Sequence, residues 1–180
     1  MITFALILIT GIVSYFGFND FNLFDKLCYS PRRVIHFKEY WRTYTYALLH
    51  GDWMHLIFNM FTLYSFGSIL ESYGVGSYLL LIGLTTPLSL VYNLYTKRKS
   101  YSYTAVGASG YVSALLFAFI WLNPTSTLLF FIIPMPAWLF GIVFIGASYY
   151  MMKKGMMGDV GHDVHIAGAI AGLLSAMVIY

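Results

Sequence analysis

Long apolar stretches dominate this sequence and constrain its fold more than any other feature. Six of them cover residues 2–18, 53–70, 75–95, 105–122, 127–152 and 163–180. Each approaches or exceeds the roughly 17 to 25 residues that a helix needs to cross the hydrocarbon layer of a bilayer. Because 59% of the 180 residues are hydrophobic and 9% are charged, the apolar surface exceeds what one soluble core of this size can bury. The sequence predicts a multi-pass integral membrane protein.

The predicted architecture is all-α, a single domain over residues 1–180. Pro134-Met135-Pro136 interrupts the fifth stretch, because proline removes an amide donor and disfavours helix before it. The fifth helix is therefore expected from residue 136, after an interfacial segment at 124–135. Helices are predicted at about 2–18, 53–70, 75–95, 105–122, 136–152 and 163–180.

The connection 19–52 is the longest one outside the predicted helices. It carries five of the ten basic residues together with several aromatic ones, and such a mixture suits the membrane interface. We expect it to be structured and partly sunk among the headgroups. The first stretch lacks the basic flank and cleavage site of a signal peptide, so it is interpreted as a retained helix.

Polar residues stand at the starts of alternate predicted helices. His55 lies in the first turn of the second helix, with Asn59 one turn deeper on the same face. Ser109 lies about one turn into the fourth helix, and His165 lies in the first turn of the sixth. Because the chain crosses the membrane alternately, these groups share one side, at a depth of roughly 5 to 10 Å. An unpaired hydroxyl or imidazole at that depth is penalised unless it lines a wet cavity.

Each of these residues also has a structural interpretation. Gly107 and Gly110 could let helices approach closely, as could Gly168 and Gly172, and His55 with Asn59 could form interhelical hydrogen bonds. Their conjunction favours chemistry instead. A serine hydroxyl needs a base within reach, which histidine supplies near neutral pH. Free amide groups at a helix start, with side-chain donors beside them, suit a developing oxyanion.

The chain resembles the rhomboid family of intramembrane serine proteases over nearly its whole length. The resemblance rests on Trp41-Arg42, His55-Leu56-Ile57-Phe58-Asn59, Glu71 with Gly74, Gly107-Ala108-Ser109-Gly110, and His165-Ile166-Ala167-Gly168 continuing to Gly172.

The resemblance implies a fold of six transmembrane helices and a role for each motif. Ser109 would be the nucleophile and His165 the base of a dyad without an acid. His55 and Asn59 would stabilise the oxyanion beside the Ser109 amide, with Gly107 and Gly110 shaping that loop. Structural support would come from Trp41, Arg42, Glu71, Gly168 and Gly172. Pro134-Met135-Pro136-Ala137-Trp138 resembles the start of the fifth helix, the family's proposed side gate.

The implied activity is a serine endopeptidase that cuts transmembrane segments of other proteins through an acyl-enzyme. Expected partners are such substrates and the lipid bilayer, with no cofactor, no metal and no nucleic acid. The expected location is a prokaryotic cell membrane. No sequence feature indicates the oligomeric state.

Two features depart from the family pattern. Many rhomboids carry a tyrosine four residues after the serine, where it stacks on the histidine, and here that position is Ser113. His162 is one turn before His165 and could be the neighbour that orients it, although a residue so near the water boundary is expected to be solvated. Every lysine and arginine lies in odd-numbered connections, so the positive-inside rule places the site in the cytoplasm. The resemblance implies the opposite side for typical bacterial members.

Two alternative functions remain open. The first is a catalytically silent relative that binds membrane clients through the same fold. The second is a metal site built from His50, His55, His162 and His165, since imidazole is a good zinc ligand; no carboxylate accompanies these histidines at a ligand-pair spacing such as H-E-x-x-H.

Overall fold

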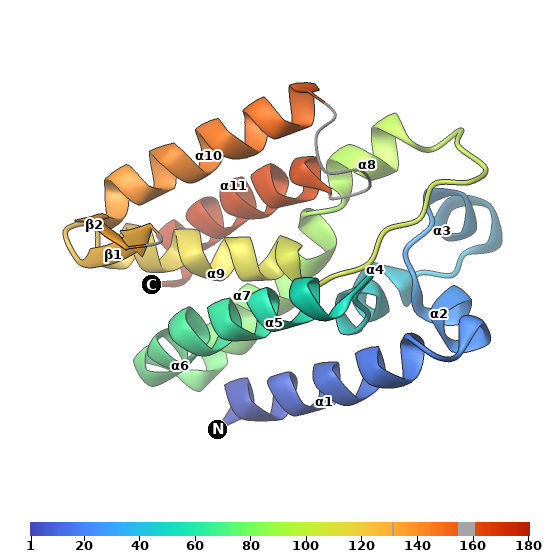
Figure 1. Cartoon of the computed structure of the whole chain (residues 1–180), viewed down its shortest axis with the longest axis horizontal. Helices are drawn as coiled ribbons and strands as arrows, with labels where there is room; N and C mark the ends of the chain where they lie inside the picture. Colours follow the sequence, from blue (N-terminus) through green and yellow to red (C-terminus); the bar gives the residue numbers. More distant parts are fainter. Residues whose placement is uncertain (131, 155–160) are drawn as a thin grey trace.

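Helices make up most of the protein in the computed structural model, which describes residues 1–130, 132–154 and 161–180 (Figure 1). The helices are α1 (Ile2–Gly17), α2 (Phe21–Leu27), α3 (Pro31–Phe37), α4 (Arg42–Thr45), α5 (Trp53–Thr62), α6 (Ser68–Tyr73), α7 (Val75–Leu88), α8 (Val91–Thr96), α9 (Ser109–Leu122), α10 (Ala137–Lys154) and α11 (His162–Ile179). A 3-10 turn, η1 (Tyr46–Leu48), follows α4, and a π-helical turn, η2 (Leu63–Gly67), joins α5 to α6.

Two helical stretches of the described chain are long and apolar enough to cross a membrane, Val75–Thr96 and His162–Ile179. Two further apolar helices are shorter, Ile2–Gly17 and Ser109–Leu122. A helix pairs the backbone groups of its interior within itself, which suits apolar helices to lipid.

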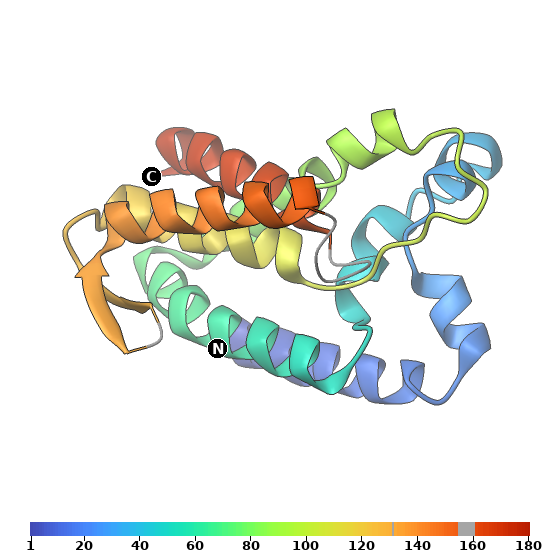
Figure 2. The same ribbon diagram turned by 45° about the horizontal axis from the view of Figure 1, so that its top comes forward.

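The central element is α9, which lies among α5, α7, α10 and α11 (Figures 1 and 2). Every residue from Gly110 to Ile120 is buried, as expected for a helix that is hydrophobic on all sides. Leu115 in its middle is fully buried. The first residue of α9, Ser109, is thereby held at the end of the most enclosed helix in the described structure.

Close contact between α9 and α11 depends on two glycines. A Cβ at Gly168 would lie 2.9 Å from the carbonyl carbon of Gly110 and closer still to its oxygen, and one at Gly172 would collide with the Ala114 backbone. Small residues at this spacing let helix backbones approach. The packing brings the start of α11, which carries His165, beside the start of α9.

The connection between α1 and α5 folds into α2, α3, α4 and η1 at one end of the bundle (Figure 2). Arg42 is its buried centre, 2% exposed. Its Nη1 donates to the carbonyl oxygens of Asp25 at 2.6 Å and Cys28 at 2.7 Å, while its Nε contacts Glu39. Two loop carbonyls and one carboxylate thus converge on one cation, and this holds the connection in place.

Two expectations from the sequence are corrected by the structure. The fold is not all-α, because within the segment expected to be interfacial β1 (Thr127–Phe130) pairs antiparallel with β2 (Ile133–Pro136). Helix α9 begins at Ser109 and not at residue 105. The cause is long-range: the Ala105 backbone exchanges hydrogen bonds of 2.9 and 3.0 Å with that of Tyr29, which keeps it extended.

Candidate active site

Hydrogen bonds to three other residues hold the backbone before Ser109. Ala105 pairs with Tyr29, the Gly107 amide donates to the Tyr46 carbonyl at 3.0 Å, and the Ala108 amide donates to His50 Nε2 at 3.3 Å. Ser109 follows as the first residue of α9. Its own amide belongs to the first turn, where amides lack intrahelical acceptors.

Gly107 is required at its position for two reasons. Its φ of 120° is a conformation that residues with a side chain rarely adopt. A Cβ there would also stand 2.6 Å from Cε1 of His55. The His55 ring therefore packs directly against the loop that delivers the serine.

Helix α5 positions His55 through an N-cap. The Asp52 carboxylate accepts the His55 amide at 2.8 Å, so the helix begins at Trp53. Asn59 is buried one turn further along, and its side-chain Nδ2 donates to the His55 carbonyl at 2.8 Å. One of the two Asn59 amide hydrogens is thus used within the helix.

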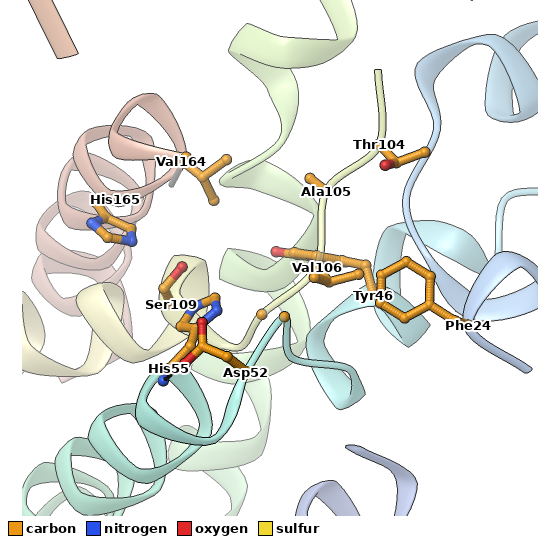
Figure 3. A pocket seen from close by; sticks show the side chains of 13 residues that line it. Phe24, Tyr46, Asp52, His55, Thr104, Ala105, Val106, Ser109, Val164 and His165 are labelled. Atoms are coloured by element: carbon orange, nitrogen blue, oxygen red, sulfur yellow. Dashed lines mark hydrogen bonds between the residues drawn. The ribbon is translucent and has the colours of Figure 1, made fainter. Parts of the chain in front are cut away.

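His165 lies in the first turn of α11, facing the start of α9 (Figure 3). Its Nε2 is buried and has no hydrogen-bond partner in the described part of the chain, so no bond to Ser109 Oγ is formed in this structure. Hydrogen bonds between catalytic groups are often long without substrate and tighten in its presence.

Two cavities meet at the serine. One, of about 370 Å³, is bordered on the connection side by Phe24, Thr104 and Val106 (Figure 3). The other, of about 420 Å³, lies between α5 and α10, with Phe58 and Phe144 in its walls. Both are lined by Asp52, His55, Ser109 and His165. The serine can therefore be reached from the polar connections and from between two apolar helices.

His50 holds the loop before Ser109 through a neutral ring. Ser14 Oγ donates to the Leu48 carbonyl at 2.8 Å, so its 2.9 Å contact with His50 is one in which Nδ1–H donates. His50 Nε2 is then free to accept the Ala108 amide. Burial, together with the neighbouring His55, lowers the pKa of His50 to about 3, against a smaller opposing effect of Asp52.

The residues expected to give structural support lie in different parts of the fold. Gly110 and Gly168 meet at the α9–α11 contact. The Glu71 carboxylate accepts the amides of Ile2 at 2.7 Å and Thr3 at 3.0 Å at the start of α1, while Trp41 is half-exposed on the first connection. His162, expected to be solvated, is instead buried, because α11 packs its first turn into the bundle.

The four histidines of the alternative metal site do not gather into one set. His50 contacts His55 with ring centroids 5.0 Å apart, and His162 contacts His165 at 5.6 Å. Among the described residues, no group of three histidine, cysteine or acidic side chains has the arrangement of a metal site.

Three residues contact the site in ways that the sequence does not indicate. Asp52 lines both cavities, and its spacing before Trp53 and His55 is an N-cap signal that could have identified it. The sequence indicates His50 only as a candidate metal ligand. Phe144 stands within an apolar helix, where no sequence pattern distinguishes it from its neighbours.

The fold and site together define a helical protein in which a serine and a histidine converge from the starts of two packed helices. Residues 38–180 match the family described as Rhomboid domain. The chain is 32% identical over 149 residues to "RHOMBOID-like protein 12, mitochondrial" of Arabidopsis thaliana, an alignment covering 73% of this chain and 44% of that protein. It thus spans less than half of that relative. This chain belongs to the rhomboid family, and it is a membrane protein.

Proposed function

We propose that this chain is an intramembrane serine endopeptidase that cleaves transmembrane segments of other proteins. In this proposal the helices form a multi-pass bundle of six membrane crossings, with α5, η2 and α6 as one of them. The observation that carries it is the convergence of Ser109, His165 and His55 on two cavities that share these side chains.

The proposed chemistry uses the residues already placed. As Ser109 Oγ bonds to the scissile carbonyl carbon, its proton passes to His165, and the oxyanion lies near the Ser109 amide, His55 and Asn59. His165 then gives the proton to the leaving nitrogen as the C–N bond breaks. Water that reaches the acyl-enzyme from the side of the first connection gives a proton to His165 as its oxygen bonds to the acyl carbon. The bond between that carbon and Ser109 Oγ then breaks, Oγ takes the proton back from His165, and the new carboxyl end of the substrate leaves.

Substrate helices would approach through the cavity between α5 and α10. That cavity is lined largely by apolar side chains, among them Met54, Phe58 and Leu116, and apolar segments favour such surroundings over water. Because the carbonyls of a helix are already hydrogen-bonded, segments with helix-weakening residues near the cut would be preferred.

A fluorophosphonate probe tests this function directly, because it reacts only with an activated serine. We expect covalent labelling of the purified protein, lost in Ser109→Ala and strongly reduced in His165→Ala. Ser113→Ala is the matched control, since this serine lies one turn further on α9 and lines the same cavity; it should label like the wild type. Equal labelling of the wild type and Ser109→Ala would refute the proposal.

A catalytically silent, client-binding protein is the second candidate. The observation in its favour is the absence of a Ser109–His165 hydrogen bond in the described structure. Binding of a transmembrane helix without any labelling of Ser109 would support it.

A further inference from the structure

His165 lacks an aromatic neighbour on α9 at the position one turn after the nucleophile. That position is Ser113, which is buried and lines the same cavity as Ser109 and His165. A hydroxymethyl group offers no ring face on which an imidazole can stack. The orientation of His165 must therefore come from other contacts.

Two aromatic rings contact His165 in the described structure. His162 meets it edge-on, with centroids 5.6 Å apart and planes at 84°. Phe144 lies 6.3 Å away with its plane tilted by 32°, closer to a stacked arrangement. Both distances fall within the range of favourable ring contacts.

Of these two rings, Phe144 is the one that can set His165 relative to the rest of the site. His162 precedes His165 by one turn on α11, so it moves together with that helix. Phe144 belongs to α10, a separate element. It is held in turn by Phe117 of α9, with ring centroids 5.7 Å apart and planes at 61°.

We propose that Phe144 is a positioning residue, which holds the His165 imidazole in the plane needed for proton transfer and couples that orientation to the docking of α10. The proposal rests on the dyad function proposed above. Phe144 contacts Phe117 of the helix that carries Ser109, and it also contacts the proposed base, His165. It lines the cavity between α5 and α10 as well. A displacement of α10 that widens this cavity would release the base at the same time.

This role makes the opposite prediction from simple packing. If Phe144 only held α10 closed, removing its ring would widen the lipid-side cavity and leave His165 competent, so reactivity would stay the same or rise. If it orients His165, removing the ring lowers reactivity. Misplacement of a reacting group by about 1 Å costs on the order of 100-fold in rate.

The test is the second-order rate of Ser109 labelling by a small fluorophosphonate in the purified full chain, which bypasses the docking of a protein substrate. Phe144→Met keeps an apolar side chain of similar length without a ring, and Phe144→Tyr keeps the ring. Tyr149→Leu is the matched control, because this exposed aromatic residue lies on the same helix. Thermal midpoints show that each variant is folded, and Phe144→Leu serves as a second ringless variant.

We expect Phe144→Met and Phe144→Leu to label about 10- to 100-fold more slowly, with Phe144→Tyr and Tyr149→Leu within about threefold of the wild type. Wild-type rates in folded ringless variants would overturn the proposal, as would a loss in Phe144→Tyr equal to that in Phe144→Met. Absence of labelling in the wild type would instead refute the proposed protease function, so the two failures are distinguishable.

Discussion

At the scale of single residues, the loop before Ser109 depends on a histidine outside the proposed dyad. His50 connects α1, through Ser14, to the amide of Ala108. Only the neutral ring can make both contacts, because a protonated Nε2 would direct its hydrogen at the Ala108 N–H. The position of Ser109 is thus linked to the protonation state of a buried histidine that has no part in the proposed chemistry.

This linkage predicts a pH dependence of stability. The pKa of His50 is about 3 in the folded protein and 6.5 ordinarily. The contribution of the neutral His50 to the free energy of unfolding is therefore complete above pH 6.5, and it is lost as the pH falls from 6.5 toward 3. Between pH 7 and pH 5 the loss in the free energy of unfolding is about 2 kcal/mol.

Thermal midpoints in detergent at both pH values, for the wild type and His50→Gln, measure this effect. The wild type should lose more stability on acidification than the variant. His36→Gln, which changes an exposed histidine on the first connection, is the control and should behave like the wild type. Equal losses in the wild type and His50→Gln would contradict the assigned role.

At the scale of elements, the contact of α9 with α11 brings the two proposed dyad residues together. We predict that Gly168→Ala lowers stability by about 1 to 3 kcal/mol, because the added methyl group meets the Gly110 backbone, which cannot rotate away. Labelling of Ser109 should also slow, since α11 carries His165.

Gly146→Ala is the matched control for this substitution. Gly146 is exposed on α10 with open space around it, and alanine favours a helix over glycine by about 1 kcal/mol. Its thermal midpoint should stay the same or rise. A Gly168→Ala variant as stable and as reactive as the wild type would show that the helices do not pack as described.

Some elements of the fold can be predicted from the sequence and others cannot. Apolar patterning located the apolar helices, and motif spacing identified the family. Patterning could not show that Ala105 stays extended, because its partner, Tyr29, is 76 positions earlier in the chain. Nor could it distinguish the hairpin at 127–136 from an irregular segment, or identify which phenylalanine of α10 reaches His165. Each of these depends on tertiary contacts.

At the scale of the whole molecule, most basic residues lie at the same end as the proposed active site. The basic residues of the first connection and of the segment around residues 97–99 lie at the end bearing the Ser109 cavity, whereas the hairpin and both chain ends lie at the other (Figure 2). The positive-inside rule places this basic end in the cytoplasm, and the family resemblance places it outside.

Cysteine labelling decides between the two orientations. On a Cys28→Ser background, Ser102→Cys reports on the basic end and Thr125→Cys on the opposite one, and both positions are exposed. We expect an impermeant maleimide to label only one of them in intact cells. The resemblance predicts Ser102→Cys and the charge distribution predicts Thr125→Cys. Equal labelling of both would contradict a membrane crossing between these positions.

Cleavage itself is the most direct test of the proposed protease. The purified chain, reconstituted in vesicles with a panel of transmembrane substrates, would be compared with Ser109→Ala and His165→Ala, with products located by mass spectrometry. We predict cuts within or beside a membrane segment for the wild type, none for Ser109→Ala, and a rate at least about 1000-fold lower for His165→Ala. Cleavage by Ser109→Ala at the wild-type rate would contradict the assignment of Ser109 as the nucleophile.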